Sequence, residues 1–277
     1  MPPFPNDAQN EFSKALISKL LDVGSIPDLP PSTRVQFAGI HAWLTDSRNT
    51  LLQLLTTEKR LHRLRNSILG DVQEGLWSAY YHLSNIEAIE KDLLNCLREA
   101  FEQIPPGLFP YGYTAAFNPR RLTCEYQAFV LVIRRTLEYF AQSIGIFFKC
   151  DVRGIRHLVT NRHLRRAQPA TIREPVLSSI ESGLKKLTFV FPGNESRSVR
   201  DRIAHWEHAS AGGCIAHYEP DGTVNIGFEG GGENLNPTFC SPKRDQKPVN
   251  PTSVLKGQLT LAERLIFDVY SEIQRAL

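Results

Sequence analysis

The chain has no run of eighteen uncharged apolar residues, the minimum for a membrane-spanning helix. Residues 1–7 have neither the basic stretch nor the apolar run of a secretory signal. The five cysteines are scattered without close pairs, which argues against a disulfide framework. We therefore expect a soluble, cytoplasmic protein with free thiols and no membrane partner.

Several motifs of nucleotide-binding and hydrolytic enzymes are also absent. The chain has no Walker loop, no dinucleotide-binding glycine fingerprint, no serine in a nucleophile elbow and no His-Glu-x-x-His. The run 230–232 consists of glycines, but it lacks the lysine and the strand-to-helix setting that phosphate cradling needs. A net charge of +3 is too small to establish nucleic-acid binding, so the distribution of charge is more informative. We expect no cofactor and no metal ion.

The sequence does contain long stretches with apolar residues at helical spacing. With 277 residues, 42% of them hydrophobic, the chain can bury one large core or two modest ones. The spacing predicts helices over 12–21, 32–68 and 72–104, with Ser32 as an N-cap and Gly70 ending the second helix. We expect the two long helices to form an antiparallel pair.

Residues 105–119 are rich in proline and glycine, which predicts a connection between helices where the chain can be divided. We place a boundary there, between an N-terminal helical region, 1–120, and a helical bundle, 121–277. Within the bundle, residues 123–148 predict a helix too apolar for the surface, and we expect it to be central.

Further helices are predicted over 175–187 and 253–276. Alternating polarity in 214–219 and 223–228, with Pro220-Asp221-Gly222 between them, predicts a β-hairpin. The expected fold is therefore mostly α, a helical bundle with one inserted hairpin at about 214–228.

An arginine, an acid and an imidazole lie close together in Arg200-Asp201-Arg202-Ile203-Ala204-His205. Ser196 and Ser198 precede this segment as candidate helix caps. Asp201 and His205 are four residues apart and so share a helical face, where the carboxylate can orient the imidazole. A guanidinium can grip an anionic oxygen at two points, so the segment is suited to phosphate chemistry. Chance alone supplies about half of one such arginine–histidine pair per chain, so the surrounding helices matter.

The order arginine, polar residue, three residues, histidine at Arg200 to His205 resembles the motif of the HEPN superfamily, all-α bundles that include many metal-independent RNases. The resemblance covers roughly residues 121–277, because an apolar helix with an internal glutamate at 125–148 precedes the motif and a closing helix at 253–276 follows it.

The resemblance implies a metal-independent endoribonuclease. His205 would transfer the proton, Arg200 would clamp the phosphate, Asp201 would orient the imidazole or contact the ribose, and Arg202 would be a further phosphate ligand. It also implies a homodimer that brings two motifs to one cleft, and a toxin or defence effector with a possible antitoxin partner.

The most basic region spans residues 149–173, and few acids offset it. It could follow an RNA backbone, or it could be a solvated helix and loop face. Our predicted RNA- and phosphate-binding residues in this region are Arg153, Arg156, Arg162, Arg165 and Arg166.

Two other hypotheses stay open. The protein could be a catalytically silent module of the same fold that binds RNA, a nucleotide or a protein partner. Alternatively, zinc could join helix and hairpin through His205, His208, Cys214 and His217, which have ligand types suited to a tetrahedral site. Their spacing matches no metal signature that we can justify physically.

Overall fold

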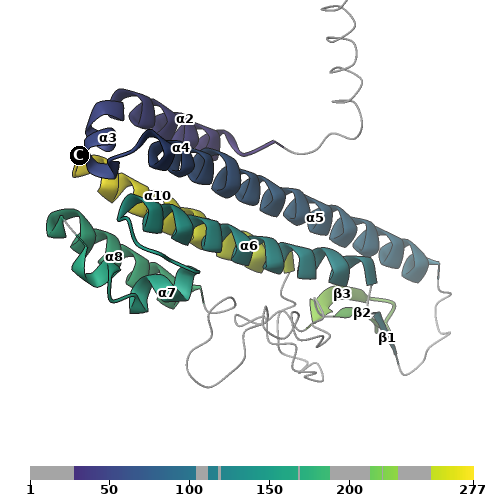
Figure 1. Cartoon of the computed structure of the whole chain (residues 1–277). Helices are drawn as coiled ribbons and strands as arrows, with labels where there is room; N and C mark the ends of the chain where they lie inside the picture. The colour runs from purple at the N-terminus through teal and green to yellow at the C-terminus, as the bar shows by residue number, and fades with distance from the viewer. Residues whose placement is uncertain are drawn as a thin grey trace, which may run out of the picture.

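A bundle of long helices with a small antiparallel sheet at one end forms the described part of the chain (Figure 1). This computed structural model describes residues 28–103, 112–117, 120–167, 169–187, 213–219, 221–229 and 251–277. Its elements are α2 (Pro31–Asp46), α3 (Arg48–Leu55), α4 (Glu58–Asn66), the π-helix η1 (Ser67–Val72), α5 (Gln73–Glu102), β1 (Tyr113–Phe117), α6 (Arg120–Phe147), α7 (Ile155–Thr160), the 3₁₀-helix η2 (Leu164–Arg166), α8 (Ala170–Lys186), β2 (Gly213–Tyr218), β3 (Val224–Glu229) and α10 (Pro251–Arg275). The predicted fold class is confirmed, and the helix predicted over 12–21 lies outside the described residues.

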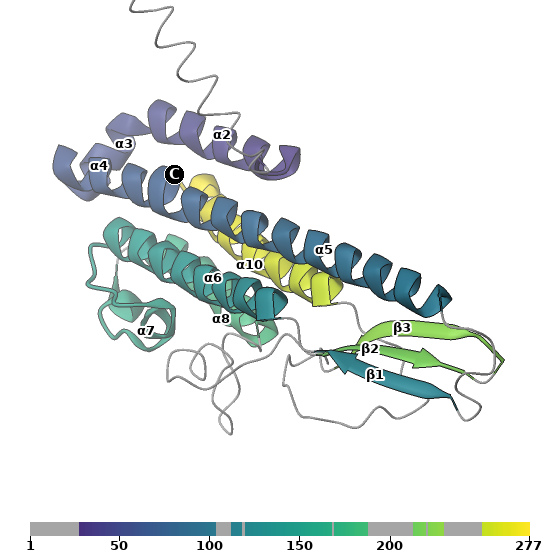
Figure 2. The same ribbon diagram turned by 90° about the vertical axis from the view of Figure 1, so that its right-hand side faces the viewer.

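The prediction of one helix over 32–68 is wrong, because three helices, α2, α3 and α4, occupy this stretch. Thr56 ends α3 in the left-handed conformation, with φ of 68°, and Thr57 starts α4 by accepting a hydrogen bond from the backbone nitrogen of Arg60. Gly70 ends nothing, since it lies inside η1, which continues directly into α5. The chain therefore reverses direction near residue 56 and not near residue 70. As a result, α2 is antiparallel to α4 and α5 (Figures 1 and 2).

Helix α6 is central, as predicted, and it packs antiparallel to α5. Phe129, Ile133 and Phe140 of α6 are completely buried. Helices α5 and α6 approach closely at Gly75, where an added Cβ would lie 2.2 Å from Oγ1 of Thr136. Such an approach requires a residue without a side chain.

One continuous hydrophobic core extends from Leu29 in front of α2 to Ile273 in α10. Helix α10 packs against α8, α5 and α6, so the last helix completes the bundle. The two regions predicted on either side of residue 120 share this core.

The predicted hairpin is confirmed as β2 and β3, but the sheet has a third strand. Gly222 makes the turn possible with φ of 89°, and Asp221 Oδ1 accepts a hydrogen bond from the backbone nitrogen of Thr223. Strand β1 comes from the segment expected to be a loop, and it pairs antiparallel with β2. This strand could not be predicted from its local sequence, because its partner strand is about 100 residues further along the chain.

Helix α8 begins five residues earlier than predicted and contains Pro175.

No helix among the described residues combines the length and the apolar composition that crossing a bilayer requires. The described cysteines, Cys96, Cys124, Cys150 and Cys214, are free thiols, as predicted.

Candidate functional site

The motif residues Arg200, Asp201, Arg202 and His205 lie outside the described residues, as does His208. Their predicted roles therefore remain predictions. The structure describes the elements on either side of the motif in the sequence, α8 before it and β2 after it. It also describes the basic segment and the helices that carry it.

Four of the predicted phosphate-binding arginines, all of them after α6, have described side chains, and these are exposed. Arg162 and Arg166 are exposed, and neither has an ion-pair partner within the described part of the chain. Arg153 is exposed beside Asp151 at 3.8 Å, and Arg165 lies 3.5 Å from Glu181. Arg156 belongs to α7, and its side chain lies outside the described residues. Exposed ion pairs of this length are weak, so both paired arginines can still contact an external anion.

Asn161 holds the loop that carries these arginines in a fixed shape. It is buried, its Nδ2 donates to the carbonyl oxygen of Asp151 at 2.8 Å, and its Oδ1 accepts from the backbone nitrogens of His163 and Leu164. Leu164 is itself completely buried. The loop is therefore anchored from inside while its arginines stay in solvent, an arrangement suited to binding an anionic surface.

The zinc hypothesis has two of its four residues in the described part, Cys214 and His217 on β2. Because side chains alternate along a strand, residues three apart point to opposite faces of the sheet. Burial and the nearby carboxylate of Glu90 raise the pKa of the Cys214 thiol to about 11, which disfavours the thiolate that zinc binds. The described residues contain no group of three or more His, Cys, Asp or Glu side chains that could hold a metal ion.

A histidine–carboxylate pair that no sequence motif indicated lies between α5 and α6. Nδ1 of His82 lies 2.8 Å from Oε2 of Glu125, and both side chains are about one quarter exposed, at 21% and 24%. The ring of Tyr81 stands edge-on to the imidazole, 5.3 Å away between centroids. A carboxylate that accepts from Nδ1 leaves Nε2 free to take up a proton, so the pair has the chemistry of a general base. The two residues are 43 positions apart, and no local pattern connects them.

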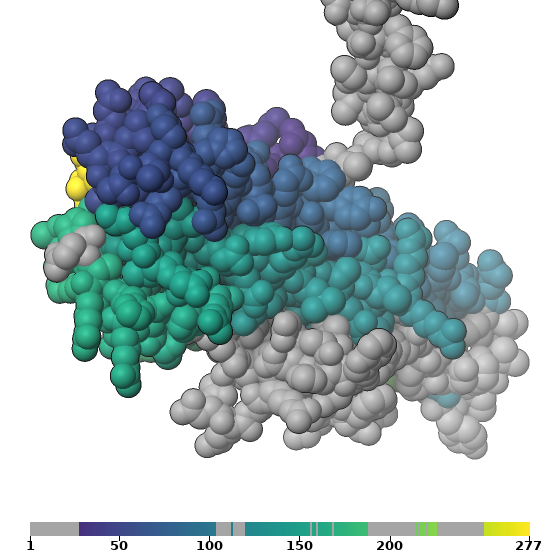
Figure 3. Space-filling view, in the orientation of Figure 1, coloured from purple at the N-terminus to yellow at the C-terminus, as the bar shows by residue number. Residues whose placement is uncertain are grey.

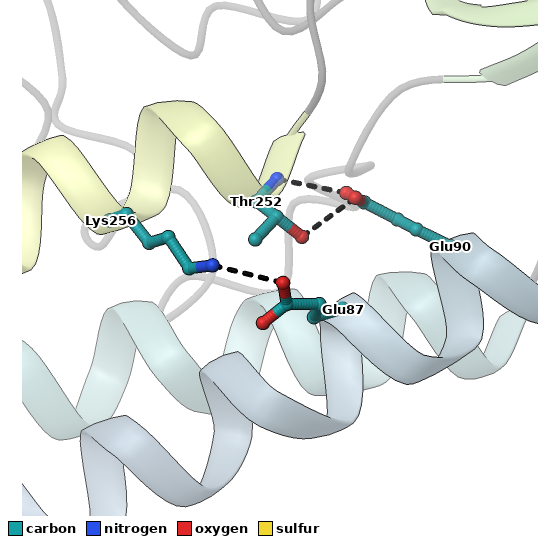
Figure 4. Close-up of polar contacts among 4 residues, drawn as sticks. All are labelled: Glu87, Glu90, Thr252 and Lys256. Atoms are coloured by element: carbon teal, nitrogen blue, oxygen red, sulfur yellow. Dashed lines mark hydrogen bonds and ion pairs between the residues drawn. The ribbon is translucent and has the colours of Figure 1, made fainter.

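Glu90 is a buried acid that fixes the start of α10 (Figure 4). Its carboxylate accepts hydrogen bonds from the backbone nitrogen and from Oγ1 of Thr252, at 2.8 and 2.7 Å. The first backbone N–H groups of a helix have no partner within the helix, and the helix dipole favours a negative charge there. One turn away, Lys256 Nζ and Glu87 Oε1 form a 3.0 Å ion pair on the surface. Glu90 thus attaches the closing helix to α5.

Replacement of Glu90 by alanine is expected to lower the free energy of unfolding by about 2–4 kcal/mol, because two buried donors of Thr252 lose their acceptor. Glu90→Gln keeps one carbonyl acceptor and should cost less. The matched control is Glu87→Gln, which breaks only an exposed ion pair and should change stability by no more than about 0.5 kcal/mol. Urea unfolding measures all three, and equal losses for Glu90→Ala and Glu87→Gln would contradict the capping role.

Comparisons of the chain with protein-family models, with curated proteins and with solved structures found no match.

Proposed function

We propose that this protein is a metal-independent endoribonuclease of the HEPN type. The observation that carries the proposal is the segment Arg200 to His205 in a chain whose described part is a helical bundle. The long apolar helix expected before the motif corresponds to α6, and the closing helix expected after it corresponds to α10. The exposed arginines between α6 and α8 add a surface that an RNA backbone can contact.

The proposed reaction uses only side chains and the RNA itself. His205 removes the proton from a ribose 2′-hydroxyl, and the resulting oxygen attacks the adjacent phosphorus. Arg200 offsets the negative charge that builds on the non-bridging oxygens, and an acid protonates the departing 5′-oxygen. Asp201 keeps the imidazole in the required orientation. The products are a 2′,3′-cyclic phosphate and a free 5′-hydroxyl.

A base and an acid are both needed, whereas one chain supplies one motif. A symmetric homodimer that places two copies of His205 and Arg200 across a shared cleft meets this requirement. In this proposal RNA is the substrate and the protein acts as a toxin or defence effector, with an antitoxin protein as a possible regulator.

The test is incubation of the intact protein with a pool of tRNA and mRNA in EDTA, with the product ends analysed. We expect cleavage to continue in EDTA and to leave 2′,3′-cyclic phosphates. Cleavage that stops in EDTA, or products with 3′-hydroxyl ends, would contradict the mechanism. Size-exclusion chromatography with light scattering tests the homodimer on the same sample.

A catalytically silent RNA-binding module is the second candidate. It is favoured by the basic segment, whose exposed Arg162 and Arg166 need no motif to bind phosphate. Salt-sensitive RNA binding by an intact protein that cleaves nothing would select this function over the nuclease.

A further inference from the structure

The surface of α4 is strongly basic, although it lies outside the segment in which the sequence predicts RNA contacts. Its nine residues include only one acid, and its apolar residues Leu61 and Leu64 are buried in the core. The basic face of α4 consists of the exposed side chains Lys59, Arg60, Arg63 and Arg65, with His62 beside them. Almost the whole solvent-facing side of the helix is therefore cationic.

Two cations of this face are free to meet an external anion. Within the described part of the chain, neither Lys59 nor Arg63 has an ion-pair partner, and the one acid of the helix, Glu58, is already paired with Arg48 on α3. Lys59 and Arg63 are four residues apart, which places them one turn and about 6 Å apart along the helix. Two exposed, unpaired cations at this separation can contact two neighbouring phosphates of one strand.

The other two arginines are held in place by local contacts. Nη2 of Arg65 lies 2.9 Å from Nε2 of His41 on α2. A guanidinium can only donate, so Nε2 of His41 is the acceptor in this contact. Arg60 Nη1 donates to the carbonyl oxygen of Leu55, at the end of α3. The basic face is therefore partly ordered before any ligand binds, which reduces the entropy lost on binding.

The same face lacks what a membrane or a protein partner would need. The exposed large hydrophobic residues of the described chain are Val35, Leu131 and Leu277, none of them on α4. A helix that lies in a membrane surface buries an apolar face in lipid, whereas the apolar face of α4 packs in the core. The centre of a protein interface is usually aromatic or apolar. A partner with many regularly spaced charges and little apolar surface fits better, and a nucleic-acid backbone has these properties.

Helix α4 and the basic segment after α6 are neighbours of the same helix, α6. Helix α4 contacts α6, which also contacts α7. In Figure 3 the α3 and α4 region (blue), α6 (teal) and the segment from α7 to α8 (green) appear together, with α6 in the middle. The exposed residues of α6 include Arg135, and Lys149 follows its end. Cations therefore occur on all three elements.

We infer that the basic face of α4 binds the phosphate backbone of RNA, and that the N-terminal helices thereby give this protein an RNA-binding surface of their own. The inference takes its class of partner from the proposed function, but binding requires no cleavage. Binding here is independent of base sequence, because Lys and Arg contacts to phosphates carry no base information.

The test measures the affinity of Lys59→Gln/Arg63→Gln for a labelled single-stranded RNA of mixed sequence by fluorescence anisotropy at several salt concentrations. His205→Ala is present in every variant, so that cleavage does not interfere. For single strands, each lost phosphate contact lowers the slope of log affinity against log salt by about 0.7, so the double variant should lose about 1.4 in slope and about 25-fold in affinity near 0.1 M salt.

The matched control is Lys91→Gln/Arg98→Gln, which removes the same two residue types from exposed positions on the later half of α5. This half of α5 lies at the sheet end of the bundle, away from α4 (Figure 1). The control should change the slope by less than half as much. Equal losses in the two variants would reduce the effect to net charge and overturn the inference, as would unchanged binding by the α4 variant. Circular dichroism must show that both variants are folded.

Two further outcomes separate this inference from the proposed nuclease. An intact protein that cleaves no RNA, yet loses binding when Lys59 and Arg63 are replaced, retains the α4 surface and loses the nuclease. Lys59→Gln/Arg63→Gln is also made in the chain that keeps His205. If this variant binds and cleaves RNA normally, the nuclease is retained and the α4 surface is lost. Vesicles that contain phosphatidylserine provide the last arm, because binding to them that depends on Lys59 and Arg63, without any RNA binding, would overturn the assignment to RNA.

Discussion

Substitution of Gly75 by alanine is expected to lower the free energy of unfolding by about 1–3 kcal/mol, although alanine favours a helix by about 1 kcal/mol. The added Cβ would lie 2.2 Å from Oγ1 and 3.0 Å from Cβ of Thr136, so α5 and α6 would have to separate. Thr136 is buried, and its hydroxyl donates to the carbonyl oxygen of Val132 at 2.8 Å, so a rotation away from residue 75 would cost that hydrogen bond. Urea unfolding followed by circular dichroism measures the loss.

The control is Gly39→Ala on α2, where an added Cβ would meet no atom within 4 Å. This substitution should stabilise the protein by up to about 1 kcal/mol, because it adds helix propensity without a clash. Addition of Thr136→Ala to the Gly75→Ala variant should restore part of the lost stability, since it removes the closest atom. Gly75→Ala and Gly39→Ala variants of equal stability would contradict the close packing of α5 on α6.

Replacement of His205 by alanine is expected to slow RNA cleavage in EDTA by about 100-fold to 10,000-fold, the usual contribution of a general base or acid. In the proposed reaction the His205 imidazole removes the proton of the 2′-hydroxyl, and an alanine side chain has no group that can accept a proton. The loss should appear in kcat, with affinity for RNA nearly unchanged, since the basic segment and the basic face of α4 are intact.

His208→Ala is the matched control, because it removes an imidazole three residues away from His205. It should retain nearly full activity if the histidine of the motif is the proton carrier. Equal activity of His205→Ala and the unmodified protein would overturn the proposed roles of the motif. A rate that depends on His82 or Glu125 instead would move the reaction to the pair between α5 and α6.

The long elements of the fold were predictable from local patterns. Residues of α5, α6 and α10 repeat their apolar positions every three or four residues, and this spacing reports the buried face of a helix directly. The hairpin followed from period-two alternation around a glycine turn. By contrast, the break at Thr56 was missed, because a threonine in the left-handed conformation has no strong sequence signal.

The polar residues also divide into those that local sequence predicts and those whose partners are distant in the sequence. Arg153, Arg162, Arg165 and Arg166 were predicted to bind RNA or phosphate. They are exposed, and their binding stays a prediction. The burial of Glu90 could not be predicted from the sequence, because charged residues are almost never buried unless they are paired, and its partner Thr252 is 162 positions away. Glu263 is partly buried, and it accepts hydrogen bonds from the hydroxyls of Thr33 and Tyr80 on two other helices. Burial raises the pKa of its carboxyl.

The amino-acid sequence alone determined the helical class, the hairpin, the apolar central helix and the order of residues in the Arg200 to His205 motif, because each depends on neighbours a few positions apart. The folded structure was needed to show that β1 joins the hairpin and that Glu90 caps α10. It was also needed to show that His82 meets Glu125, and that α4 and the basic segment lie beside the same helix, α6. These contacts join residues tens to hundreds of positions apart. The core that brings these residues together forms by burial of apolar surface. Because the hydrophobic effect has no direction, the local sequence does not indicate which polar residues will become partners.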